Sequence, residues 1–128
     1  MLKNNPQTVC FVIDKAHEFH AKEQVTIPAT TSAPTEDWAM QVLANHKDDL
    51  TYQELVATIS ELEKEQQVEL VALMWLGRGN YDLEEWALAK EAAREAWNER
   101  TADYLIATPL IADYLMEGLN LQGYSCEQ

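Results

Sequence analysis

Apolar side chains recur every three or four positions along most of this chain, which is the spacing of one face of a helix. The first such set begins just after Asn5 and Pro6, a residue pair that suits a helix cap and a first helical turn. We therefore predict a helix over residues 6–23. No segment shows the strict apolar–polar alternation of a half-buried strand. The pattern predicts an all-α fold.

A stretch rich in proline and threonine interrupts the helical pattern at residues 25–34, and its composition predicts a flexible loop. A second helix is expected over residues 36–46, where the helical spacing resumes. Thr51 and Glu54 then have the spacing of a capping box, which predicts that a third helix begins at Thr51.

Breaks in the pattern divide the second half of the chain into further helices. A run of polar residues predicts a break near residues 63–65, and the helix after it is expected to end at Gly77 or Gly79. Asp82 is expected to begin a fifth helix that continues to about residue 98.

The most apolar segment, residues 101–121, contains Pro109, which breaks a continuous helix by removing one N–H donor. We therefore expect Thr108 to cap a final helix and Gly118 to end it.

Together these segments predict a compact bundle of five to six helices in a single domain. An N-terminal helix occupies residues 1–24 of this scheme, the flexible loop occupies residues 25–34, and a helical core occupies residues 35–123.

The charge balance of the chain restricts the partners it can bind. Its 128 residues include 22 acidic and 9 basic ones, which gives a formal net charge of −13. Such a surface repels the phosphates of nucleic acids and anionic membranes, so we expect it to bind neither. The acidic surface has two interpretations: it serves solubility alone, or it meets a basic protein partner.

The two cysteines, Cys10 and Cys126, lie near opposite ends of the chain and show no metal-binding or redox spacing. A disulfide between them has no spacing signature, so we interpret both as reduced thiols of a cytoplasmic protein. No signal peptide and no apolar stretch long enough to span a membrane is visible.

His17 and His20 are three residues apart, which places both on one face of the first helix. They are weak candidates for a metal site, because zinc needs three or four ligands and nothing else in the sequence marks the remaining ones. A role in packing is the alternative that we prefer, and we expect no cofactor.

Arg78 is a cation between two glycines at a predicted helix end, within a strongly acidic chain. Its planar guanidinium suits a carboxylate or other anion, which is the functional interpretation. In the structural interpretation, Arg78 binds carbonyl groups of its own helix or pairs with Asp113, a charged residue inside an apolar segment.

Two sequence blocks resemble a bacterial family catalogued as domain of unknown function 3775. They are residues 71–80 (VALMWLGRGN) and the apolar set that runs from Tyr104 to Leu119. The resemblance covers roughly residues 52–123. It implies a helical fold and directs attention to Arg78, Tyr104 and Asp113 as matching positions, and it implies no activity or cofactor.

Two functional classes remain. The preferred one is a non-enzymatic protein-interaction module that uses its acidic surface, and a symmetric homodimer is compatible with it. The alternative is a small-ligand binder or enzyme with a pocket near residues 77–80 and 108–113.

Overall fold

Seven helical segments follow one another along residues 2–22, 49–108 and 110–126, the part of the chain that the computed structural model describes. They are α1 (Pro6–Lys22), α3 (Leu50–Ser60), α4 (Lys64–Arg78), the short 3₁₀ helix η2 (Leu83–Glu85), α5 (Trp86–Ala96), α6 (Thr101–Ala107) and α7 (Ile111–Leu121). The predicted all-α fold with six α-helices is confirmed within this part. The expected loop at 25–34 and helix at 36–46 lie outside the described residues.

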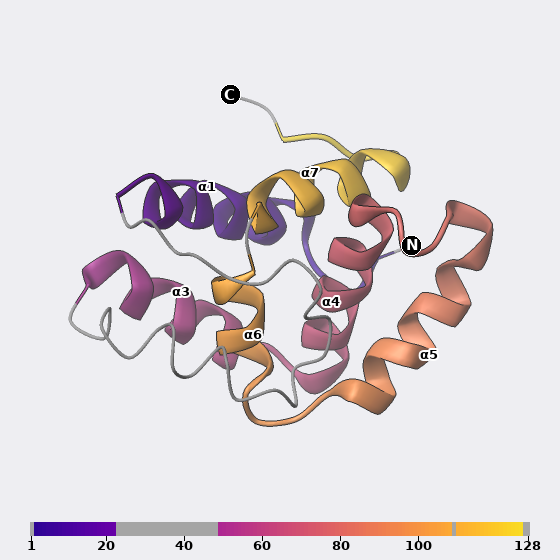
Figure 1. Cartoon of the computed structure of the whole chain (residues 1–128), viewed down its shortest axis with the longest axis horizontal. Coiled ribbons are helices and arrows are strands. Elements are labelled where there is room, and N and C mark those ends of the chain that lie inside the picture. Colours follow the sequence, from indigo (N-terminus) through magenta and orange to yellow (C-terminus); the bar gives the residue numbers. More distant parts are fainter. Residues whose placement is uncertain (1, 23–48, 109, 127–128) are drawn as a thin grey trace.

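Helix α4 is the central element of the fold (Figure 1). Every residue from 67 to 76 is buried, because α7, α5 and α6 all pack on this helix. A helix segment that is buried on all sides has no solvent face, which explains why α4 lacks the clear stripe of a surface helix. The break predicted near residues 63–65 is confirmed, since α3 ends at Ser60 and α4 begins at Lys64.

Helices α4 and α7 approach each other at the level of their backbones. A Cβ atom added to Gly77 would collide with the carbonyl group of Tyr114, and one added to Gly118 would collide with the carbonyl group of Leu73. The prediction that Gly118 ends the last helix is wrong. Gly118 lies inside α7, where its lack of a side chain permits this contact, and a left-handed glycine, Gly123, follows the helix with φ of 92°.

Helix α5 packs on the opposite side of α4 from the rest of the core (Figure 1). Its small residues Ala89 and Ala93 are fully buried against the core. Arg94 binds the carboxylate of Glu65 in α4 through Nη2 at 2.8 Å and Nε at 3.0 Å. This hydrogen bond lowers the pKa of Glu65 below its usual value and raises that of Arg94.

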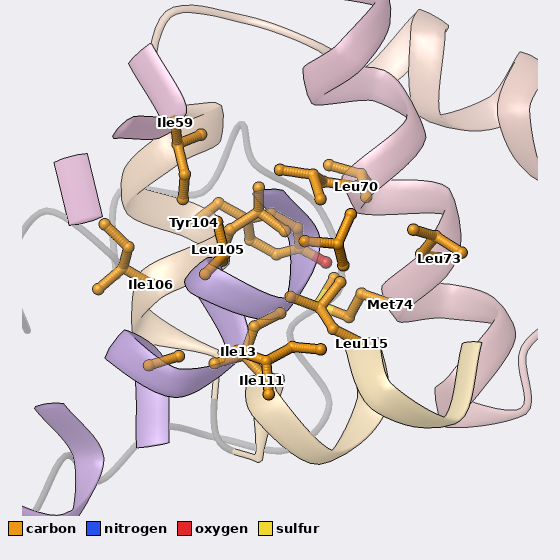
Figure 2. Packing of buried hydrophobic residues seen from close by; sticks show 14 of the residues in the cluster. Ile13, Ile59, Leu70, Leu73, Met74, Tyr104, Leu105, Ile106, Ile111 and Leu115 are labelled. Carbon is orange, nitrogen blue, oxygen red and sulfur yellow. The ribbon is translucent and has the colours of Figure 1, made fainter. Parts of the chain in front are cut away.

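The main core lies where α1, α3, α4, α6 and α7 meet, and Figure 2 shows their side chains converging. Helix α1 packs on α7 and α3, and α3 packs on α6. The labelled core residues are Ile13, Ile59, Leu70, Leu73, Met74, Tyr104, Leu105, Ile106, Ile111 and Leu115.

Local capping explains where α1, α3 and η2 begin. The side chain of Asn5 accepts a hydrogen bond from the Gln7 N–H, so this predicted cap is confirmed. Asp82 and Glu85 form a reciprocal capping box, but Asp82 caps η2, and the predicted fifth helix begins later, at Trp86, and ends at Ala96. Helix α3 differs from the prediction, because Asp49 caps it and accepts hydrogen bonds from the N–H groups of residues 51 and 52. The Thr51 hydroxyl donates instead to Glu18 of α1 at 2.8 Å.

The start of α7 also differs from the prediction. Leu110, with φ of 61°, occupies the cap position in place of Thr108. The Thr108 hydroxyl donates back to the carbonyl oxygen of Tyr104 at 2.7 Å, so it serves the end of α6 rather than the start of α7.

Cys10 of α1 and Cys126 form a disulfide, and their Cα atoms lie 5.6 Å apart. The interpretation of both residues as reduced thiols is therefore wrong for this structure. Their separation along the chain hides the pairing, because only the packing of α7 on α1 brings the C-terminal tail to Cys10. Among the described residues, no helix is both long and apolar enough to cross a membrane.

Candidate functional site

Arg78 is the last residue of α4 and is half-buried. Gly79 follows it in the left-handed conformation, with φ of 96°, which ends the helix as predicted. The Nε group of Arg78 donates to Oδ1 of Asn80 at 2.7 Å. No carboxylate in the described part of the chain lies within 4.0 Å of Arg78, so it forms no ion pair there.

The predicted pairing of Arg78 with Asp113 is wrong. Asp113 lies on the outer face of α7, and its side chain is 60% exposed. Its neighbours Ile111, Ala112 and Leu115 face the core, so helical spacing turns Asp113 towards solvent. Its Oδ1 atom lies 3.2 Å from Nε2 of His17 on α1.

Tyr104 of α6 does lie close to Arg78. Its ring is fully buried, and its hydroxyl accepts a hydrogen bond from Nε1 of Trp75 at 3.1 Å. Burial raises the pKa of Tyr104, while the hydrogen bond from Trp75 and the adjacent Arg78 act in the opposite direction. The structure therefore brings together two of the three residues in the matching sequence blocks.

A cavity of about 320 Å³ opens beside Arg78, and we call it the arginine cavity. Its lining residues in the described part of the chain are Trp75, Arg78, Asn80, Tyr81 and Ala92. The rings of Trp75 and Tyr81 are stacked, with centroids 6.2 Å apart and planes at 27°. This position agrees with a pocket near residues 77–80, whereas Thr108 and residues 110–113, the described part of the second predicted segment, are not among the lining.

A second hollow of about 440 Å³ lies between the turn after α4 and the end of α7, and we call it the acidic cleft. Its described lining consists of Leu76, Gly77, Gly79, Asn80, Tyr81, Asp82, Leu83, Glu85, Glu117 and Leu121. Three of these carry carboxylates and none is basic. Leu83 is 47% exposed and Leu121 is 40% exposed, which leaves apolar surface open to solvent.

His17 and His20 each contact another helix. Nε2 of His20 lies 2.8 Å from the carbonyl oxygen of Ile106, so His20 links α1 to α6, and Nε2 of His17 lies beside Asp113 of α7. The described residues contain no group of three or more histidine, cysteine or acidic side chains that could hold a metal ion.

Two lining residues, Tyr81 and Ala92, were not predicted from the sequence. Tyr81 lies two residues after Gly79, and an aromatic residue this close to a predicted helix end could have been recognised in the sequence as a candidate for the cavity wall. Ala92 carries no such signal, because its place in the cavity depends on how α5 packs against α4.

Comparison with known proteins identifies one family. A family model described as "Protein of unknown function (DUF3775)" matches residues 52–124, which span α3 to the end of α7 and include both sequence blocks. No curated protein and no solved structure matches the chain.

Proposed function

Since the chain belongs to the DUF3775 family, whose description names no activity, we propose from its geometry that it is a non-enzymatic protein-interaction module that binds a basic partner in the acidic cleft. The observation that carries this proposal is the lining of the cleft, which combines exposed leucines with carboxylates and lacks a described basic side chain.

The carboxylates of the cleft have oxygen atoms that can accept further hydrogen bonds. Asp82 and Glu85 each use one oxygen, Oδ1 and Oε1, in their capping box, and each keeps a second oxygen. Glu117 is exposed on α7. A lysine or arginine in the cleft would therefore meet several acceptors within a field that the net charge of −13 reinforces.

The apolar part of the cleft defines the rest of the partner. Leu83 of η2 and Leu121 of α7 expose apolar surface in the same hollow as the acids. A segment that places an apolar side chain beside a lysine or arginine would bury this surface and neutralise the carboxylates together.

Fluorescence anisotropy with a labelled peptide tests this proposal. The probe is an octapeptide of lysine and leucine, and its control is an octapeptide of glutamate and leucine. We expect saturable binding of the lysine peptide alone, weakened when salt rises from about 50 to about 300 mM. Glu117→Gln is expected to weaken binding about threefold, as for one partly screened ion pair. Glu61→Gln, the same change at an exposed site directly after α3 and outside the cleft, is the matched control.

Equal weakening by Glu117→Gln and Glu61→Gln would contradict the proposal, because the peptide would then respond only to overall charge. Unchanged binding in a Leu83→Ser variant would contradict the apolar half of the proposed partner.

A bacterial cytoplasmic location also belongs to this proposal. The cytoplasm keeps most thiols reduced, so Cys10 and Cys126 would be dithiol there and would pair on oxidation. Alkylation of thiols in intact cells, followed by mass spectrometry, tests the location: quantitative disulfide in the cell would place the protein in an oxidising compartment.

A symmetric homodimer is the last part of the proposal. Exposed leucines at positions 50, 88 and 110 lie outside the acidic cleft and are available to such a contact. Sedimentation velocity over a range of protein concentrations tests it, and a single monomeric species throughout would refute it.

A further inference from the structure

We infer that the arginine cavity is a second binding site, beside the acidic cleft of the proposed protein docking, and that it takes a small, flat carboxylate. Asn80 and Tyr81 line both hollows, whereas Arg78 lines the arginine cavity and Glu117 the acidic cleft. The cavity combines a half-buried guanidinium with two aromatic rings and contains no described carboxylate. Its volume of about 320 Å³ lies at the lower end of the range for ligand pockets.

The hydrogen-bonding capacity of Arg78 supports this inference. A guanidinium has five N–H donors. Asn80 accepts from Nε and the Tyr104 hydroxyl lies nearby, so even with both groups engaged the majority of the donors remain for a ligand. Because Oδ1 of Asn80 already accepts from Arg78, the amide nitrogen of Asn80 adds further donors to the same lining.

The absence of an ion-pair partner within the described residues distinguishes Arg78 from Arg94. Arg94 is held by Glu65 and Glu91, whereas Arg78 touches only an amide and a hydroxyl there. The chain has 22 acidic residues against 9 basic ones, yet the described lining of this cavity includes no carboxylate. The guanidinium of Arg78 is therefore available to bind an anionic ligand.

The aromatic wall favours a flat ligand. Trp75 and Tyr81 are nearly parallel and line the cavity together, so they offer an apolar surface to a ring or planar group. The indole N–H of Trp75 already donates to Tyr104. The polar group of Trp75 is therefore satisfied inside the protein, and a ligand needs to supply only apolar contact to this ring.

The charge of the site favours a carboxylate over a phosphate. Arg78 is the one cation among the described lining residues. A phosphate monoester carries close to two negative charges at neutral pH, and one guanidinium would leave part of that charge uncompensated in a strongly acidic protein. A carboxylate carries one charge and matches the guanidinium fork in a bidentate geometry.

The backbone around Arg78 is fixed before any ligand arrives. Gly77 lies against the backbone of Tyr114 in α7, and Gly79 ends α4 in a left-handed conformation. The guanidinium is thus carried by a helix end that cannot shift without separating α4 from α7. Such preorganisation reduces the entropy lost when a ligand binds.

Benzoate is the probe for this site, with benzamide as its neutral counterpart, phenyl phosphate as the dianion and cyclohexanecarboxylate as the non-planar acid. Binding is measured by NMR titration, with the indole N–H of Trp75 as the reporter. We expect benzoate to bind saturably and at least about fivefold more tightly than each of the other three compounds.

Two variants address the lining directly. Arg78→Lys keeps the charge but loses the planar fork, and we expect it to weaken benzoate binding about tenfold. Ala92→Met fills the cavity while leaving Arg78 unchanged, and we expect it to abolish binding. Ala87→Met, the same substitution at an exposed position of α5, is the matched control and should bind benzoate as the native protein does.

Glu117→Gln separates this site from the acidic cleft, because it should weaken the lysine peptide and leave benzoate binding unchanged. Equal affinity for benzoate and benzamide would overturn the inference, as would tighter binding of phenyl phosphate. Benzoate binding that survives Ala92→Met would overturn it too, since the ligand would then lie elsewhere.

Discussion

Gly118 of α7 lies directly against the carbonyl group of Leu73 in α4, so closely that no Cβ atom fits between the two backbones. Gly77 of α4 makes the reciprocal contact with Tyr114 of α7. The two glycines therefore set the distance between the two helices that pack most extensively on each other in the described fold. The position of Arg78, one residue after Gly77, depends on the same contact.

Replacing Gly118 with alanine is expected to lower the free energy of unfolding by about 3 kcal/mol, at the upper end of the usual cost of overpacking. The new methyl group would have to push one backbone away from another, which no side-chain rotation can relieve. Urea denaturation followed by circular dichroism measures the change.

Gly79→Ala is the natural comparison for this variant, because a Cβ at Gly79 meets nothing within 4 Å. Its cost comes only from the left-handed backbone and should be about 1 kcal/mol. If Gly118→Ala proves no more destabilising than Gly79→Ala, the backbone contact between α4 and α7 is looser than the structure indicates.

Glu69 is a buried carboxylate that anchors the start of the chain to α4. Its oxygens accept hydrogen bonds from the backbone N–H groups of Lys3 and Asn4, and from the Asn4 side chain, each at 2.8 Å. Glu69→Leu would leave these donors without an acceptor and is expected to cost about 3 kcal/mol. Glu95→Leu, the same change on the exposed face of α5, should cost little.

Hydrogen exchange checks the anchoring separately from global stability. In Glu69→Leu, the amides of Lys3 and Asn4 should exchange much faster than in the native protein, while those in the middle of α4 stay protected. Unchanged protection at Lys3 and Asn4 would show that other contacts hold this segment.

The disulfide between Cys10 and Cys126 joins positions separated by 116 residues, so it restricts a very long loop in the unfolded chain. Reduction is expected to lower the free energy of unfolding by about 4 kcal/mol. Denaturation with and without reductant measures this loss, and a Cys10→Ser/Cys126→Ser double variant should match the reduced protein. A native protein insensitive to reductant would contradict the pairing.

Two tyrosines make the stability sensitive to high pH. Burial raises the pKa of Tyr104, and burial with a hydrogen bond to Asp103 raises the pKa of Tyr52. A raised folded-state pKa contributes stability below the unfolded value of about 10, and this contribution disappears as the pH rises towards the folded value. Urea denaturation between about pH 9 and 11.5 should therefore show stability falling above about pH 10.

Tyr52→Phe tests this assignment, since it removes one of the two groups that retain their protons on folding. The fall in stability with pH should become shallower in this variant. An unchanged slope would show that Tyr52 ionises in the folded protein as readily as in the unfolded chain.

Periodicity and capping were enough to predict most of the helices, because both depend on residues close together in the sequence. The break after Ser60, the end at Gly79 and the capping box at Asp82 all follow from local chemistry. The α3 cap was displaced from Thr51 to Asp49, since either residue can cap and the contact of Thr51 with Glu18 of α1 is tertiary.

The candidate site was predictable only in part. Arg78 stood out as a cation beside two glycines, but its closeness to Tyr104 and its distance from Asp113 depend on the packing of α4, α6 and α7. Gly118 shows the same limit, because a glycine that ends a helix and one that permits a backbone contact look alike in a sequence.

Within the described residues, α5 packs chiefly on α4 and η2, through the small side chains of Ala89 and Ala93 and the ion pair of Arg94 with Glu65. Ala92 of the same helix lines the arginine cavity together with Trp75 and Arg78 of α4. The breadth of the cavity is consequently set by the packing of α5 on α4, so a substitution that loosens this packing would alter the ligand site without changing Arg78 itself.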